Sequence, residues 1–213
     1  MERKYAKVRK WQVMGNNITI PIEHPLYPKR VAYSAARKLM RVGDGIGCRG
    51  GRPVSWIIRK WRGGAYDLSH WATIVRDIEI GASGRLEVFE FTGGEGGHTD
   101  YLSSRFEKEH GTVLWFPMNC TPHQQERIIE CAADLEIEGV QYDYGTTWLA
   151  ILRDTLPLDV TQFNCSESGW WLMTASGRLK RRYDKKGKEI APVPGDFPVW
   201  ADCSQVFELV MDS

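Results

Sequence analysis

One cysteine in this sequence stands where a helix is expected to begin. In residues 163–167 (FNCSE), Cys165 directly follows Asn164, a residue type that often caps helices. Glu167 lies three positions beyond Asn164, the spacing of a capping box. The unpaired N–H groups and the dipole of a helix start favour a thiolate over a thiol. Cys165 is therefore a candidate nucleophile, although a buried, inert cysteine is the commoner case.

A second run places a histidine at the head of a strand. Residues 69–75 (SHWATIV) alternate, so that His70, Ala72 and Ile74 share one face. An imidazole there can serve as the base that a thiol nucleophile needs, and the small Ala72 leaves room for another group. The alternative is a histidine whose role is purely structural.

A catalytic imidazole needs a third group to orient its ring, and Glu90 is the best candidate. Glu90 shares a strand face with Leu86 and Val88, and a carboxylate on such an apolar face is rarely buried without a partner. A simple hairpin across residues 81–84 would set Glu90 opposite Val75, so either a bulge or strong coiling of the sheet must bring it toward His70. The rival third groups are His98, His110, Glu95 and Asp100.

Size and composition fit one ordinary globular domain. The chain has 213 residues, of which 42% are hydrophobic and 26% charged. The net charge of +1 argues against a nucleic-acid partner, and the basic run 178–186 is expected to be a solvated hairpin. The sequence shows neither a signal peptide nor an apolar run long enough for a transmembrane segment, which favours a cytoplasmic protein.

Cysteine usage indicates reduced thiols and no metal site. There are five cysteines and no CxxC or HxxxH pair, so we expect neither a structural zinc nor any other cofactor. The four cysteines that lack the helix-start context are expected to be structural: Cys48, Cys120, Cys131 and Cys203.

The expected elements come in clusters and do not alternate strictly, which favours an α+β fold. Strands are expected within 11–22 (a hairpin turning at 15–17), 43–51, 69–80, 85–92 and 111–117, and helices at 28–41, 53–62, 121–137, 146–154 and 165–176. Residues 93–97 are expected to form a flexible, glycine-rich loop, and 204–211 a short, partly apolar segment.

At this point the motifs resemble a known family. Tyr142-x-Tyr144-Gly145 followed by 163–167 resembles the YxWG … FDCSG pattern of NlpC-type papain-like cysteine peptidases, and 69–75 resembles that family's Ser-His strand. The histidine precedes the cysteine by 95 positions (165 − 70), an order similar to that of the circularly permuted, YiiX-like branch. Residues 43–50 and 55–59 resemble two further sequence motifs of that branch, so the resemblance covers a core of roughly 40–175.

The resemblance implies a papain-like fold with a central antiparallel sheet packed against the nucleophile helix. Residues 1–213 would form a single domain, with 1–27 as an N-terminal extension or hairpin. By the resemblance, Cys165 is the nucleophile, His70 the base, Glu90 the third residue and Tyr142 the active-site tyrosine. Asn164 and Glu167 depart from the Asp and Gly of the family motif, but both keep the helix cap.

The implied function is that of a thiol hydrolase, a cysteine peptidase or amidase acting on a peptide or a peptidoglycan stem peptide. One alternative is a lipid acyl ester or thioester hydrolase, or an acyltransferase, with the same residues. In that case Trp56, Ile57 and Trp61 would form an amphipathic lid with peripheral membrane contact. A second alternative is a non-catalytic binding module that retains the fold. The oligomeric state is left open.

Overall fold

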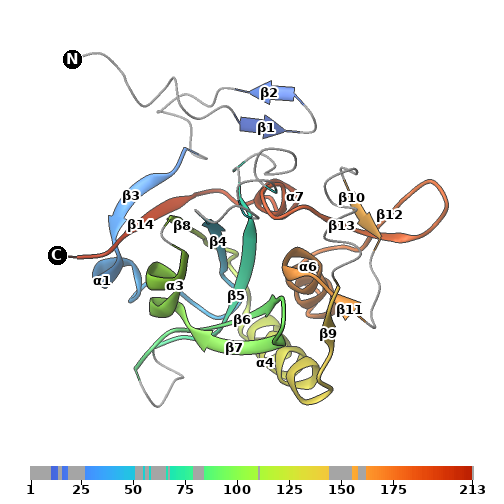
Figure 1. Ribbon diagram of the computed structural model, residues 1–213, viewed down its shortest axis with the longest axis horizontal. Coiled ribbons are helices and arrows are strands. Elements are labelled where there is room, and N and C mark those ends of the chain that lie inside the picture. Colours follow the sequence, from blue (N-terminus) through green and yellow to red (C-terminus); the bar gives the residue numbers. More distant parts are fainter. Residues whose placement is uncertain are drawn as a thin grey trace.

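A seven-stranded sheet forms the centre of the computed structural model, with the order β3-β14-β8-β4-β5-β6-β7 (Figure 1). The structure describes residues 11–13, 16–18, 27–50, 55, 58, 66, 68–78, 84–109, 111–143, 155–157 and 162–212. The strands of this sheet are β3 (Lys29–Ala32), β4 (Gly45–Arg49), β5 (His70–Arg76), β6 (Glu87–Thr92), β7 (Gly96–Tyr101), β8 (Thr112–Phe116) and β14 (Phe207–Val210). Neighbouring strands are antiparallel except β3 and β14, which are parallel. The chain is therefore α+β, as the sequence predicts.

Smaller elements surround the sheet. The helices are α1 (Tyr33–Ala36), α3 (Leu102–Glu109), α4 (Pro122–Ile137), α6 (Cys165–Ala175) and α7 (Phe197–Trp200). In the part of the chain that the structure describes, three small sheets pair β1 (Trp11–Val13) with β2 (Asn16–Ile18), β9 (Gln141–Tyr142) with β11 (Gln162–Phe163), and β10 (Thr155–Pro157) and β12 (Arg182–Tyr183) with β13 (Glu189–Pro192). Strand β11 lies directly before α6 in the chain, and its pairing with β9 holds the residues that lead into that helix.

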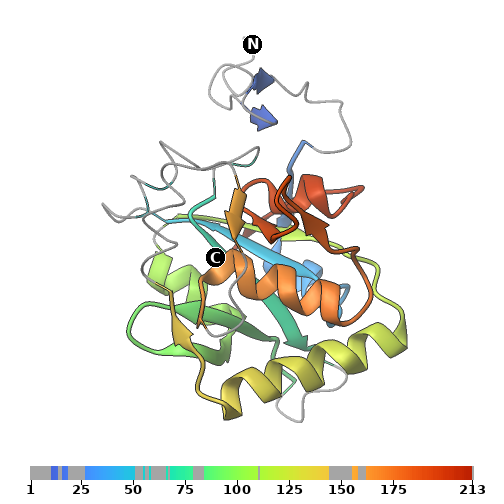
Figure 2. The same ribbon diagram turned by 90° about the vertical axis from the view of Figure 1, so that its right-hand side faces the viewer.

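The two faces of the central sheet carry separate hydrophobic clusters. Trp71, Phe89 and Phe91 belong to the cluster that includes the buried side chains of α4 and α6. Ala72 and Val88, one position away on the same strands, belong to the cluster that includes residues of α1 and α3. Strand alternation thus assigns α6 and α3 to opposite faces of β5 and β6. Figure 2 shows α4 and α6 lying together on one side of the sheet.

Trp71 fixes how closely α6 approaches the sheet. A Cβ atom added to Gly169 of α6 would lie 2.4 Å from Cδ1 of Trp71, and one added to Gly45 of β4 would lie 2.1 Å from its Cζ2. The indole also stacks on Phe197, with ring centroids 4.1 Å apart. The two glycines therefore form a slot for this ring, and the slot brings α6 against β5.

Several expected elements form where the sequence predicts them. The strands predicted within 43–51, 69–80, 85–92 and 111–117 are β4, β5, β6 and β8, and the apolar segment near the end is β14. The helix predicted at 121–137 is α4, and Thr121 and Gln124 form the predicted capping box. The first hairpin also forms, but Val13 pairs with Asn16, so its turn is earlier than predicted.

Two expectations are wrong. Residues 28–41 do not form one helix, because Lys29–Ala32 pairs with Phe207–Val210 as strand β3 before the short α1. Residues 93–97 do not form a flexible loop, because 93–95 make a turn and β7 begins at Gly96. Gly94 has a φ of 98° at that turn, so glycine is needed there for backbone geometry. The predicted helix at 146–154 lies outside the described residues, as does most of the one at 53–62.

Candidate active site

Cys165 is the first residue of α6, as the sequence predicts. The side chain of Asn164 accepts hydrogen bonds from the N–H groups of Ser166 (3.0 Å) and Glu167 (3.1 Å). The Glu167 carboxylate in turn accepts one from the N–H of Asn164 at 2.9 Å. This complete capping box fixes the helix start in one position.

Among the described residues, the backbone N–H of Cys165 at the start of α6 has no hydrogen-bond acceptor. The cap binds the N–H groups of Ser166 and Glu167 but not this one. The cysteine itself is 6% exposed, at the margin of the core. A reacting carbonyl held beside the sulfur would thus meet a donor for its developing negative charge.

His70 and Glu90 form a close pair on neighbouring strands. Nε2 of His70 lies 2.5 Å from Oε2 of Glu90, whose side chain is fully buried. The register pairs Thr73 with Phe89, which sets Glu90 opposite Ala72 and diagonal to His70. Of the two devices that the sequence allows, a bulge or strong coiling of the sheet, the structure shows a shift of register between Ile74 and Arg76.

Other charged groups gather around the same carboxylate. Arg105 of α3 forms an ion pair with Oε1 of Glu90, and Nε2 of His98 lies 3.5 Å from the same oxygen. His98 also lies 3.2 Å from Glu95, and Arg105 lies 3.8 Å from Asp100. Of the four rival third groups, His98 contacts Glu90, Glu95 contacts His98, and Asp100 lies near Arg105. His110 lies outside the described residues.

No pattern in the sequence points to Arg105 as a member of the site. Its signal would have been a helix at 102–109 that follows a strand and presents an arginine toward the sheet. The sequence predicts no helix there, because the glycines at the start of β7 favour a loop. Arg105 is 4% exposed, a degree of burial that is rare for arginine unless it is paired.

Cys165 and His70 come from adjoining elements but share no hydrogen bond or ion pair in the described structure. Trp71 turns its ring toward α6 at Gly169, whereas the neighbouring His70 turns toward Glu90, which α3 approaches. His70 is the first residue of β5, so its ring stands at the end of that strand. The structure thus forms the pair of His70 with Glu90 and leaves the sulfur separate.

Tyr142 lies in the segment that leads to the nucleophile helix. It pairs with Phe163 in the short parallel sheet of β9 and β11, and the N–H of Asp143 donates to the carbonyl of Phe163 at 3.0 Å. This pairing holds Tyr142 beside the residues that precede Cys165. Tyr144 and Gly145 of the same motif lie outside the described residues, and so do the lid residues Trp56, Ile57 and Trp61.

The remaining cysteines are in unreactive surroundings. Burial raises the pKa of the Cys120 thiol to about 11 and that of Cys203 to about 12. Burial also raises the pKa of Cys131, and Cys48 has no exposed surface. These properties support a structural role for all four.

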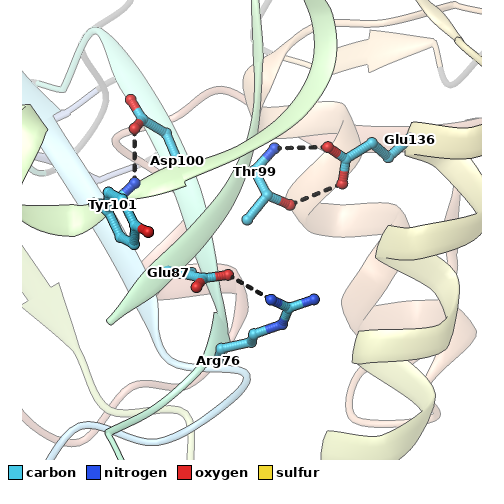
Figure 3. Close-up of a pocket in the computed structure, with 6 residues that line it drawn as sticks. All are labelled: Arg76, Glu87, Thr99, Asp100, Tyr101 and Glu136. Atoms are coloured by element: carbon cyan, nitrogen blue, oxygen red, sulfur yellow. Dashed lines mark hydrogen bonds and ion pairs between the residues drawn. The ribbon is translucent and has the colours of Figure 1, made fainter. Parts of the chain in front are cut away.

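A polar pocket of about 400 Å³ lies at the other end of β5 from His70 (Figure 3). Several of its polar groups bind one another: Arg76 forms an ion pair with Glu87 at 3.0 Å, and Glu136 accepts a hydrogen bond from Thr99 Oγ1 at 2.9 Å. Its lining residues are Arg76, Glu87, Thr99, Asp100, Tyr101 and Glu136. None of the predicted catalytic residues is among them.

Within the described ranges, no group of three or more His, Cys, Asp or Glu side chains is arranged to hold a metal ion. Glu90 lies close to two histidines, His70 and His98, but it forms an ion pair with the side chain of Arg105. Of the helices that the structure describes, none combines the length and the apolar character needed to cross a bilayer.

Comparison with known proteins identifies a fold. No family model and no curated sequence matches this chain. Among solved structures, the chain is similar to YiiX of Escherichia coli O157:H7, which is described as a metalloprotein of the DUF1105 group. The TM-score is 0.56 at 18% sequence identity, and the match covers 81% of this chain and 97% of YiiX. The chain therefore has a fold similar to that of YiiX.

Proposed function

We propose that this protein is a thiol hydrolase of the permuted papain-like type, with Cys165 as nucleophile and His70 and Glu90 as its partners. The observation that carries the proposal is the His70–Glu90 pair on strands against which the Cys165 helix packs. A carboxylate-bound imidazole and a cysteine at a capped helix start are the groups that acyl transfer through a thiol requires. The similarity to YiiX supports the arrangement of the elements.

The ring geometry assigns separate tasks to the two nitrogens of His70. Nε2 faces Glu90, so Nδ1 is the nitrogen that can exchange a proton with the thiol. The described structure shows no hydrogen bond between Cys165 and His70, and strand alternation turns His70 toward the α3 face. The proposal therefore requires the two side chains to come together when substrate binds.

The proposed reaction has two steps. The Cys165 thiolate attacks the substrate carbonyl carbon, a C–S bond forms, and the protonated His70 gives its proton to the leaving amine as the C–N bond breaks. Water then loses a proton to His70 and attacks the acyl-enzyme, which releases the carboxylic acid and restores the thiolate. The Cys165 N–H, together with the Tyr142 hydroxyl, would bind the oxyanion in both steps.

The proposed substrate is an amide, either a peptide or a peptidoglycan stem peptide. This choice rests on the resemblance in the sequence motifs, since a fold alone does not fix a reaction. Acyl esters would undergo the same chemistry at the same thiol, so the substrate class has to be measured.

Alkylation of the thiol tests the proposal most directly. Iodoacetamide labelling of the wild type is compared across pH with Cys165→Ala and His70→Ala. We expect fast labelling near neutral pH that requires both residues, because the imidazole holds the proton of the thiol. Labelling of Cys165 that is equally fast in His70→Ala, or that follows the pH profile of a free cysteine, would contradict the proposal and favour a binding module.

A substrate comparison follows with the same variants. A γ-glutamyl amide and a short acyl ester are offered to the wild type and to Cys165→Ala. We expect release of the amine from the amide by the wild type only. Hydrolysis of the ester without any action on the amide would replace the amidase assignment by that of an acyl ester hydrolase.

A further inference from the structure

Glu90 is fully buried in the sheet, which makes its charge expensive. An isolated carboxylate in such a place would take up a proton and lose its ability to hold an imidazolium. The structure supplies a compensating cation, because the guanidinium of Arg105 pairs with Glu90 from α3 and is itself 4% exposed. Breaking a buried pair of this kind is costly, since it strands the other charge.

The contacts of Glu90 are divided between its two oxygens. Oε1 faces Arg105 and, at 3.5 Å, His98, while Oε2 faces His70 at 2.5 Å. Arg105 therefore fixes the orientation in which the second oxygen meets the imidazole. An arginine also keeps its charge at every pH at which proteins fold, which the histidines do not.

The other charged groups near Glu90 come from β7 and the turn before it. His98 stands between Glu90 and Glu95, and Asp100 lies 3.8 Å from Arg105. Asp100 is itself held by the hydroxyl of Ser104, which donates to it at 2.7 Å. Asp100 therefore lies beside the pair and Glu95 beside His98. Among the described residues, the guanidinium that pairs with Glu90 is that of Arg105, and the ionised form of Glu90 depends on it.

We propose that Arg105 is a positioning residue of the active site, which keeps Glu90 ionised and aimed at His70. The inference rests on the proposed function and extends it to α3, a helix that contributes no reacting atom. Arg105 acts through Glu90 and His70 and is not expected to touch substrate.

The test uses Arg105→Met, Arg105→Lys and Glu90→Gln, with Arg76→Met as the matched control. Arg76 belongs to an ion pair at the far end of β5 and is mostly exposed. Two quantities are measured for each variant: the NMR signal of the His70 Nε2–H proton, and the pH profile of kcat/KM for the amide substrate. The NMR signal reports on the His70–Glu90 hydrogen bond whether or not the protein turns over substrate.

We expect the strongly downfield ring N–H signal of the wild type to be lost in Arg105→Met and partly restored in Arg105→Lys. The acid limb of kcat/KM should move to higher pH in Arg105→Met, and kcat should fall by about 10²-fold with a smaller change in KM. The double variant Arg105→Met/Glu90→Gln should be no slower than the slower single variant, because both changes act on one unit. Arg76→Met should match the wild type.

An unchanged ring N–H signal and pH profile in Arg105→Met would overturn the inference, as would additive losses in the double variant. If Arg105→Met does not fold, Arg105→Lys decides, because a lysine retains the charge without the planar fork. A failure of the proposed function gives a different result: Cys165→Ala would keep full turnover while the ring N–H signal still responded to Arg105→Met.

Discussion

At the scale of single residues, the candidate site depends on how Asn164 and Glu167 close the start of α6. Asn164 is 4% exposed, and its side-chain oxygen accepts hydrogen bonds from two backbone N–H groups. If this side chain were removed, water could not easily reach those N–H groups to take its place. The residue that holds the helix start is thus the immediate neighbour of the thiol. Stability and thiol reactivity can be separated here by the choice of substitution.

Asn164→Ala removes the cap acceptor and should lower the free energy of unfolding by about 1–2 kcal/mol. Asn164→Asp keeps the acceptor but adds a negative charge beside Cys165, which disfavours the thiolate. We therefore expect Asn164→Asp to unfold like the wild type and to react more slowly with iodoacetamide at neutral pH. Denaturant unfolding and labelling rates measure the two effects, and faster labelling of Asn164→Asp would refute this account.

Cysteine selectivity is a second prediction at this scale. Because burial raises the pKa of Cys120 to about 11 and that of Cys203 to about 12, both remain thiols at mildly alkaline pH. Mass spectrometry of the folded protein after brief alkylation should find the label on Cys165, with all five cysteines labelled after denaturation. Labelling of Cys203 at the rate of Cys165 in the folded state would show that this burial is wrong.

At the scale of elements, the contact that joins α6 to the sheet is the ring of Trp71 in its slot. Gly45 and Gly169 flank this ring on two sides. The slot makes a close approach possible, and it also makes the position of α6 sensitive to one methyl group.

Gly169→Ala should destabilise the protein by about 1–3 kcal/mol, because its Cβ would meet Trp71 at 2.4 Å. The matched experiment repeats the change in a Trp71→Phe background, where the smaller ring leaves space. Chemical unfolding of the four proteins forms a double-mutant cycle, and we expect Gly169→Ala to cost less in that background. An equal cost in both backgrounds would mean that the clash is relieved elsewhere.

The elements also show what the sequence can and cannot reveal. The starts of α4 and α6 were predictable because a capping box uses residues three positions apart. The need for a departure from a simple hairpin between His70 and Glu90, by a bulge or by strong coiling, was predictable because strand faces alternate with a fixed period. Strand β3 was not predictable, since its partner is Phe207–Val210 and no local pattern records a pairing over that separation.

In the candidate site, too, some residues can be predicted from the sequence and others cannot. His70, Glu90 and Cys165 could be named from short motifs, and the structure pairs the first two. Arg105 could not be named, because its role exists only once β7 and α3 bring it to a carboxylate on another strand. The relation of Cys165 to His70 depends on how α6 lies across β5, which packing determines and sequence spacing does not.

At the scale of the whole molecule, buried cysteine and tyrosine side chains should make the protein less stable at alkaline pH. Burial raises the pKa values of Cys120, Cys203 and Tyr66 in the folded protein. In the unfolded chain these groups ionise at their ordinary, lower pKa values. Stability is therefore fully present below about pH 9 and is lost as the pH rises toward the folded pKa values.

The free energy of unfolding should fall with pH above about pH 9, with each such thiol contributing up to about 1.4 kcal/mol per pH unit. Cys203→Ala removes one contributor, so its curve should fall less steeply than that of the wild type. Urea unfolding at a series of alkaline pH values measures both slopes. Parallel curves would show that Cys203 ionises equally in the folded and unfolded states.

The insertion of β14 between β3 and β8 has a consequence for biosynthesis (Figure 1). Residues 29–32 and 112–116 leave the ribosome long before residues 207–210 are synthesised. Until then, the edges of β3 and β8 that pair with β14 have unpaired backbone N–H and C=O groups. Such edges attract other chains, which makes the nascent protein a natural client for chaperones. The sheet becomes continuous only when the last strand arrives, so a chain stalled before residue 207 would be a candidate for aggregation and proteolysis.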